Sequence, residues 1–133
     1  IHKPKAVYDI LYESTWETLS QFGNTQGLKM GMIAILHTWG QNLSLHPHLH
    51  CIVPGGGTDK NGDWKNIRSD GKPVCRPGRF LFPVKALSKV FRAKYVSKLR
   101  TRNLGDQSLY DPLFKKNWIV YAKKPLSADK AGF

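Results

Sequence analysis

The chain has 133 residues, of which 41% are apolar, and it carries a formal net charge of +12. This length suffices for one domain with a hydrophobic core, and the apolar content argues against a disordered chain. No apolar run reaches the roughly 18 residues of a membrane span, and no signal-peptide pattern follows Ile1. Cys51 and Cys75 form no Cys-x-x-Cys pair, which argues against a zinc ribbon or a disulfide-rich secreted scaffold. We therefore expect a cytoplasmic protein without membrane contact.

The basic residues are concentrated in the second half of the chain. Residues 1–58 hold three lysines and three acidic residues, whereas residues 59–133 hold the other 18 basic and 6 acidic residues. This asymmetry favours a polyanionic partner over the alternative of a solvated basic face. Trp39 and Trp64 could stack on unpaired bases, with a core or hairpin role as the alternative. As phosphate contacts we expect Lys65, Arg68, Arg76, Arg79, Lys89 and Arg92.

The first half of the chain predicts a helix followed by an antiparallel hairpin. Apolar residues recur at helical spacing from Pro4 to Phe22, and Gly23 is suited to end this helix. The apolar run from Leu28 to Trp39 predicts a buried strand, although its periodicity alone does not exclude a helix. A polar turn then leads into a second strand, so that the hairpin spans roughly residues 29–54. The Gly triplet after this strand would let a backbone or a ligand approach closely.

The second half predicts another hairpin turn, a second helix and a last strand. Asn61-Gly62 indicates a turn, and the residues from 64 to 79 predict a loop or short edge strands. Pro83 begins a helix that runs to about Arg102, and residues 118–122 predict a strand. Helices mixed with antiparallel strands give the α+β class. We expect a single domain over residues 1–124 and a disordered tail over residues 125–133.

Three of the five histidines fall within Leu45-His46-Pro47-His48-Leu49-His50. Side chains two positions apart in a strand share a face, so His48 and His50 would project together with Cα atoms roughly 6–7 Å apart. Two such imidazoles can hold one metal ion. A third ligand should come from the neighbouring strand, because His46 and His50 would lie roughly 13 Å apart. Surface histidines on an edge strand are the alternative, and Cys51 would be a small buried hydrophobe on the opposite face.

A longer pattern around these histidines resembles a known family. The chain resembles the transposases of rolling-circle insertion sequences, which belong to the HUH endonucleases, in Leu36-His37-Thr38-Trp39-Gly40-Gln41-Asn42-Leu43, His46-Pro47-His48-Leu49-His50 and Pro54-Gly55-Gly56-Gly57. Further similar segments are Tyr8–Leu11, Phe82–Ser88, Val90–Arg92 and Trp118–Lys123. The resemblance implies an antiparallel sheet with flanking helices, related to the ferredoxin-like and RNA-recognition-motif folds.

The resemblance also implies a reaction and a partner. Members of this family cut one DNA strand with a tyrosine nucleophile, keep a 5′-phosphotyrosine link and rejoin the strand. A divalent metal held by the two histidines of the motif and a third polar ligand polarises the scissile phosphate. The implied partner is DNA, as the single-stranded or hairpin ends of a mobile element in the bacterial nucleoid.

By position in the motif, His48 and His50 are the expected metal ligands. We expect His37 as the third ligand because it ends the neighbouring strand; Gln41 and His46 are reserves, and a packed structural histidine is the alternative for His37. Three ligands with open positions on the ion suit catalysis. Mg²⁺ or Mn²⁺ is the expected physiological ion, and neutral imidazoles also accept Zn²⁺, Co²⁺ or Ni²⁺.

The chain departs from the family pattern at its end. The paired nucleophiles of the family lie in a Tyr-x-x-x-Tyr-Thr-His segment after a Trp-Val-Tyr-Ala-Lys strand, whereas this chain stops at Phe133 without such a segment. No catalytic nucleophile is therefore assigned among Tyr8, Tyr12, Tyr95, Tyr110 and Tyr121.

We expect a DNA-binding and metal-binding core that is inactive by itself. A non-catalytic nucleic-acid-binding module derived from a transposase is the first alternative. A hydrolase that uses metal-bound water is the second, but it needs a carboxylate base, and no acidic residue lies between Glu17 and Asp59.

Overall fold

The computed structural model describes residues 4–39, 45–69, 72–73 and 81–103. In this part of the chain two helices accompany three antiparallel strand pairs, which confirms the predicted α+β class. The elements are α1 (Pro4–Asn24), β1 (Ile33–Trp39), β2 (Leu45–Ile52), β3 (Gly56–Thr58), β4 (Trp64–Asn66), β5 (Arg68–Ser69), β6 (Lys72–Pro73) and α2 (Val84–Thr101). The strand expected at residues 118–122 and the tail at residues 125–133 lie outside the described residues.

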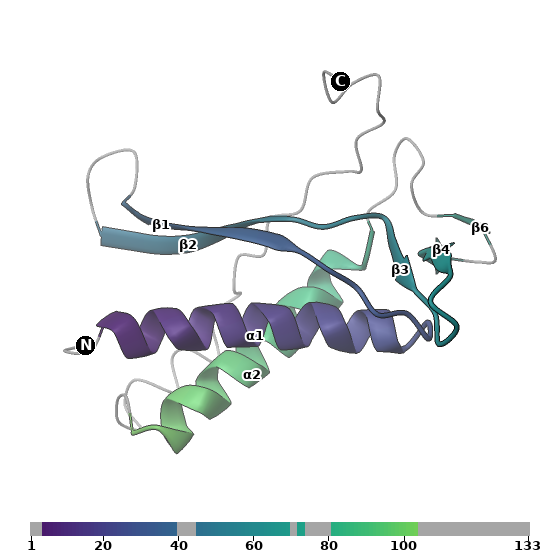
Figure 1. Cartoon of the computed structure of the whole chain (residues 1–133). Helices are drawn as coiled ribbons and strands as arrows, with labels where there is room; N and C mark the ends of the chain where they lie inside the picture. The colour runs from purple at the N-terminus through teal and green to yellow at the C-terminus, as the bar shows by residue number, and fades with distance from the viewer. Residues whose placement is uncertain (1–3, 40–44, 70–71, 74–80, 104–133) are drawn as a thin grey trace.

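The β1–β2 hairpin lies along α1, and α2 crosses α1 (Figure 1). Each helix contributes buried apolar side chains, namely Val7 and Ile10 from α1 and Val96 and Leu99 from α2. Full burial of one such side chain is worth about 1.5–3 kcal/mol of transfer free energy. Of the helices in the described residues, none combines the length and the apolar character needed to cross a membrane.

Helix α1 begins at Pro4 as predicted but is stopped by a different glycine. The N–H of Gly27 donates to the carbonyl oxygen of Asn24, and the N–H of Leu28 donates to that of Gly23, both at 3.0 Å. With Gly27 at φ +69°, these bonds form a Schellman cap. Gly23 serves packing instead, because a Cβ there would lie 2.7 Å from Cγ of Met30.

A second group of buried residues joins the end of α1 to the β3–β4 hairpin and the start of α2. Its fully packed members are Leu28, Met30, Ile67 and Phe82. Phe22 of α1 adds an aromatic contact with Phe82, with ring centroids 5.3 Å apart. This cluster holds the base of the β3–β4 hairpin in place, since Ile67 directly follows β4 and has no exposed surface.

The β1–β2 hairpin corrects the prediction of a buried strand. The strand begins only at Ile33, and the side chains of Ile33, Ile35 and Ile52 are 64%, 54% and 67% exposed. Paired residues of an antiparallel ladder share a face, so these isoleucines lie on one face of the hairpin. Helix α1 contacts β2 and covers the opposite face, where Leu36 and Leu49 are half-buried. A two-stranded hairpin with one covered face cannot bury both sides of its strands.

Cys51 also differs from its prediction. It pairs with Ala34 and therefore lies on the opposite face from the histidines, as expected. It is, however, an exposed free thiol and not a buried hydrophobe, because it lies near the end of β2.

Candidate metal centre

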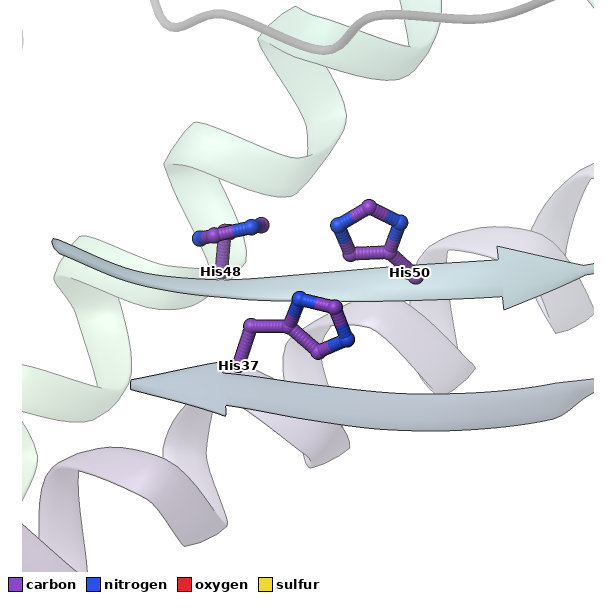
Figure 2. Close-up of side chains that lie close together, drawn as sticks. All are labelled: His37, His48 and His50. Atoms are coloured by element: carbon purple, nitrogen blue, oxygen red, sulfur yellow. The ribbon is translucent and has the colours of Figure 1, made fainter. Parts of the chain in front are cut away.

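The two strands of the β1–β2 hairpin bring three histidines together. His37 lies directly across from His48, and Ile35 lies across from His50. The ring centroids are 5.2 Å apart for His37 and His48, 4.2 Å for His37 and His50, and 4.9 Å for His48 and His50. Figure 2 shows the three side chains projecting to the same side of the hairpin, with His37 on β1 and the other two on β2. We call His37, His48 and His50 the His triad.

A bulge in β2 interrupts the pairing between His48 and Leu45. After the pair His37–His48, the next paired residues are Trp39 and Leu45, so two residues of β2 stand opposite one residue of β1. One of the two is Pro47, which lacks an N–H and is found in sheets at edges and bulges. The alternation that relates His48 to His50 therefore does not extend to His46. Of the two reserve ligands, only the backbone of His46 is described, and Gln41 lies outside the described residues.

The donor set of the triad fits a divalent metal. One ring nitrogen from each histidine lies within 4.8 Å of the others. Nitrogens bound to one ion at about 2.0–2.1 Å are about 3.4 Å apart in tetrahedral geometry, so small side-chain rotations would close the site. His50 is exposed, and His37 and His48 are half-buried, so solvent reaches the triad. Three imidazoles without a carboxylate or thiol, the composition found among the described residues, favour Mn²⁺, Zn²⁺, Co²⁺ or Ni²⁺ over Mg²⁺.

The environment of His50 favours its neutral form. Desolvation, followed by electrostatic repulsion from His37 and His48, lowers the pKa of His50 below its usual value of 6.5. The apolar side chain of Ile35, directly across the ladder, is consistent with the desolvation. A neutral imidazole is the form that binds a metal ion, so this shift prepares His50 to act as a ligand near neutral pH.

Comparison with known proteins identifies the family of the chain. Residues 31–133 match the family described as "Putative transposase" (Y2_Tnp). The chain belongs to this transposase family. The resemblance to transposases inferred from the sequence is therefore confirmed.

Two curated relatives are similar to this transposase-family chain. It is 37% identical over 142 residues to "Putative transposase y4qJ" of Sinorhizobium fredii (strain NBRC 101917 / NGR234), covering 91% of this chain and 33% of the relative. It is 39% identical over 59 residues to "Transposase for insertion sequence element IS801" of Pseudomonas savastanoi pv. phaseolicola, covering 44% of this chain and 14% of the relative. The chain thus spans about a third of the length of the first relative. No solved structure is significantly similar to it.

The described candidates for phosphate contacts in this transposase chain lie on three elements. Lys65 and Arg68 are exposed on β4 and β5, while Lys89 is exposed and Arg92 half-buried on α2. The other two, Arg76 and Arg79, lie outside the described residues.

Part of the positive charge at the end of α2 is paired with acidic residues of α1. Nζ of Lys98 lies 3.0 Å from a carboxylate oxygen of Glu17 and 3.6 Å from one of Glu13. Nη2 of Arg102 lies 2.5 Å from Glu13. Sequence reasoning missed these pairs, because Glu13 and Glu17 belong to α1, far away in the chain. The acidic groups of α1 thus bind the last turns of α2, which leaves the exposed lysines of its first turns, Lys85 and Lys89, facing solvent.

The described tyrosines have no feature of a nucleophile. Tyr95 of α2 is half-buried and stacks on Phe91 with ring centroids 5.8 Å apart. Burial raises the pKa of Tyr95, which disfavours the phenolate. Tyr8 and Tyr12 are half-buried on α1.

Proposed function

We propose that this chain is the metal-binding and DNA-binding core of an HUH-type rolling-circle transposase. One observation carries the proposal: the register of β1 and β2 brings His37, His48 and His50 together in a chain that belongs to a transposase family. The substrate would be single-stranded or hairpin DNA at the ends of a mobile element, within the bacterial cytoplasm. The phosphotyrosine chemistry of strand cleavage and rejoining would belong to the longer protein.

The residues of the triad would position a scissile phosphate. A divalent ion held by the three imidazoles supplies Lewis-acid polarisation of a phosphate oxygen. The backbone ladder between β1 and β2 pairs His37 with His48, so the site would be formed before substrate binds. His50 stays neutral because of desolvation and its two histidine neighbours. Solvent exposure of the triad leaves room for a phosphate to enter.

Basic residues outside the His triad would hold the DNA backbone. Lys65, Arg68, Lys89 and Arg92 are the described candidates for phosphate contacts, and each contact releases counterions. Their affinity for DNA should therefore fall steeply as the salt concentration rises. We assign the nucleophile to none of the tyrosines of this chain, so cleavage by this chain alone is not expected.

Calorimetric titration with Mn²⁺ tests the metal centre. The wild-type chain should bind the ion, and the His48→Ala/His50→Ala variant should not. Ile33→Ala/Ile52→Ala is the matched control, because both residues lie on the same face of the same strands and carry no ligand atom. The control should bind as the wild type does.

The same variants separate metal binding from DNA binding. Nonspecific DNA binding should persist in the His48→Ala/His50→Ala variant, because phosphate contacts come from other residues. Unchanged metal affinity in that variant would refute the site assignment. No metal binding by any of the proteins, with DNA binding retained, would favour a non-catalytic nucleic-acid-binding module.

A further inference from the structure

The indole of Trp64 lies open on the surface of the β3–β4 hairpin. Its side chain is 56% exposed, although tryptophan is among the costliest side chains to leave in water. A Cβ on Gly56 would lie 3.0 Å from both Cε2 and Cζ2 of Trp64, so the ring rests directly on the Gly56 backbone. Nε1 of Trp64 donates a hydrogen bond to Oδ1 of Asn66 at 3.2 Å. The ring is thus fixed from one side and accessible from the other.

The hairpin that carries Trp64 is rigid at its tip. The Asp59 carboxylate accepts hydrogen bonds from the backbone N–H groups of Asn61 and Asp63, at 2.9 and 3.0 Å. Gly62 has φ +83° and donates its N–H to the carbonyl oxygen of Asp59 at 3.0 Å. These bonds fix the turn between the two strands, so that Trp64 loses little freedom when a ligand stacks on it.

The base of the hairpin is equally well fixed. Ile67, immediately after β4, has no exposed surface. Lys29 and Thr58 exchange two backbone hydrogen bonds of 2.8 and 3.0 Å. Thr58 in turn pairs with Trp64 across the hairpin. Because antiparallel partners share a face, Lys29, Thr58 and Trp64 form one row across three chain segments.

Positive charge lies on the same face as the exposed indole. Lys29 is exposed in the same row as Trp64. Lys60 is exposed in the turn, whereas Lys65, the neighbour of Trp64 in β4, belongs to the opposite face of the hairpin. Of the two acidic residues in the turn, Asp59 already accepts two backbone hydrogen bonds. A flat aromatic ring beside lysines is the arrangement that binds single-stranded nucleic acid, with a base on the ring and phosphates on the cations. Paired bases in a duplex are stacked on their neighbours and do not expose their faces in this way.

We propose that Trp64 stacks on an unpaired base of single-stranded DNA while Lys29 contacts the adjoining phosphate. This inference rests on the proposed DNA-binding function and names where on the chain the strand is held. Only five residues lie between His50 and Gly56, which limits the distance between their Cα atoms to about 22 Å. One short single strand can therefore reach both the His triad and Trp64.

Fluorescence anisotropy with a labelled oligothymidine tests the stacking. Removing an aromatic platform typically weakens binding by about 5- to 150-fold per stacked base, so Trp64→Ala should fall in this range. Trp64→Phe keeps a smaller ring and should recover part of the affinity. Trp16→Ala is the matched control, because Trp16 is 42% exposed on α1, away from the hairpin. Trp16→Ala should leave oligothymidine affinity unchanged. Trp64→Ala should lower the affinity for a duplex of equal length much less than the affinity for oligothymidine.

Two further measurements exclude a merely structural role for Trp64. An oligonucleotide with 5-iodouracil should photocrosslink to Trp64 in the wild-type chain, which needs no variant to fold. Lys29→Gln should lower the salt slope of oligothymidine binding by about 0.7, the value for one phosphate contact with a single strand. Crosslinks confined to other residues would overturn the proposal.

The outcomes separate this inference from the function on which it rests. If wild type and Trp64→Ala bind oligothymidine equally, the stacking role is wrong while DNA binding stands. If the wild type binds no DNA, both fail together. Tighter binding of the matching RNA strand than of DNA would overturn the choice of partner.

Discussion

His37 lies directly across from His48 in the antiparallel ladder of β1 and β2, with ring centroids 5.2 Å apart. His50 follows two residues later on the same face and stacks on His37 with centroids 4.2 Å apart. The backbone hydrogen bonds of the hairpin therefore set the spacing of the three imidazoles. Preorganisation of this kind lowers the free-energy cost of assembling a metal site.

The identity of the third ligand is the first prediction. His37→Ala should lower Mn²⁺ affinity by at least about 100-fold. Removing a residue that only orients a metal ligand costs about 10- to 100-fold in affinity, and removing the ligand itself should cost more. His46→Ala should change the affinity little, since the bulge in β2 separates it from the alternation of the triad. Titration calorimetry on the two variants measures both effects. Equal losses in the two variants would show that the ladder in solution has a different register.

The pKa of His50 gives the second prediction. Desolvation and the two neighbouring imidazoles hold this pKa below 6.5. His37→Gln removes one source of repulsion, so the pKa of His50 should rise while staying below the usual value because desolvation remains. Proton NMR titration of the metal-free chain resolves the ring signals and gives the midpoint. A fall in the midpoint would contradict the repulsion between the two rings.

Local signals explain why much of the fold was predictable. Asn61-Gly62 predicted the turn of the β3–β4 hairpin, where Gly62 has φ +83°. Pro83 predicted the start of α2, which begins at Val84. These features depend on a few neighbouring residues, so the sequence alone carries them.

Features that depend on distant parts of the chain were not predictable. The exposure of Ile33 and Ile35 depends on which face of the hairpin α1 covers, and an apolar run does not reveal that. Gly23 and Gly27 both lie near the end of α1, and the packing of Met30 against Gly23, which the local sequence does not reveal, gives Gly23 a different role from the helix-capping Gly27.

The candidate site likewise combines features that local sequence predicts with features that depend on the pairing of distant residues. The spacing of His48 and His50 was sufficient to predict a shared face, and the hairpin brought His37 into reach. The bulge between His48 and Leu45 is visible only in the pairing register. For Trp64 the sequence favoured a core or hairpin role at least as much as base stacking, and the contact with Gly56 that orients the ring was not visible in it.

The ion pairs between α1 and α2 give the third prediction. The pKa of Glu13 lies below 4.5, mainly because its carboxylate accepts a hydrogen bond from Arg102. The positive charges of Arg102 and Lys98 lower this pKa further, whereas desolvation opposes the shift. This carboxylate therefore stabilises the fold above its unfolded-state pKa, and the stabilisation is lost as the pH falls through the lower folded-state pKa. Glu13→Gln should destabilise the chain at neutral pH by about 0.2–1 kcal/mol, the range for exposed pairs.

Urea unfolding across a pH series measures this effect. The difference in unfolding free energy between wild type and Glu13→Gln should vanish once the pH is low enough to protonate Glu13 in the folded protein. Asp9→Asn is the control, because among the described residues Asp9 pairs within α1, with the 90% exposed Lys5 side chain. A Glu13→Gln effect that stays constant down to acid pH would mean that packing, and not charge, links the helices.

The close approach of two strands at Gly56 gives the fourth prediction. A Cβ at this position would overlap the backbone oxygen of Lys65 and press on the ring of Trp64. The backbone oxygen cannot move without parting β3 from β4, so Gly56→Ala should destabilise the chain by about 1–3 kcal/mol. Gly31→Ala is the matched control, because a Cβ at Gly31 would meet no atom within 4 Å. Urea unfolding compares the two variants.

A second comparison separates the two contacts at Gly56. Gly56→Ala introduced into a Trp64→Ala chain should still destabilise it, because the overlap with the backbone of Lys65 remains when the indole is gone. If Trp64→Ala instead abolishes the effect of Gly56→Ala, the indole alone fills the space over Gly56. The chain with only Gly56→Ala should also bind oligothymidine more weakly than the wild type, because the added methyl group displaces the ring from its position on the Gly56 backbone.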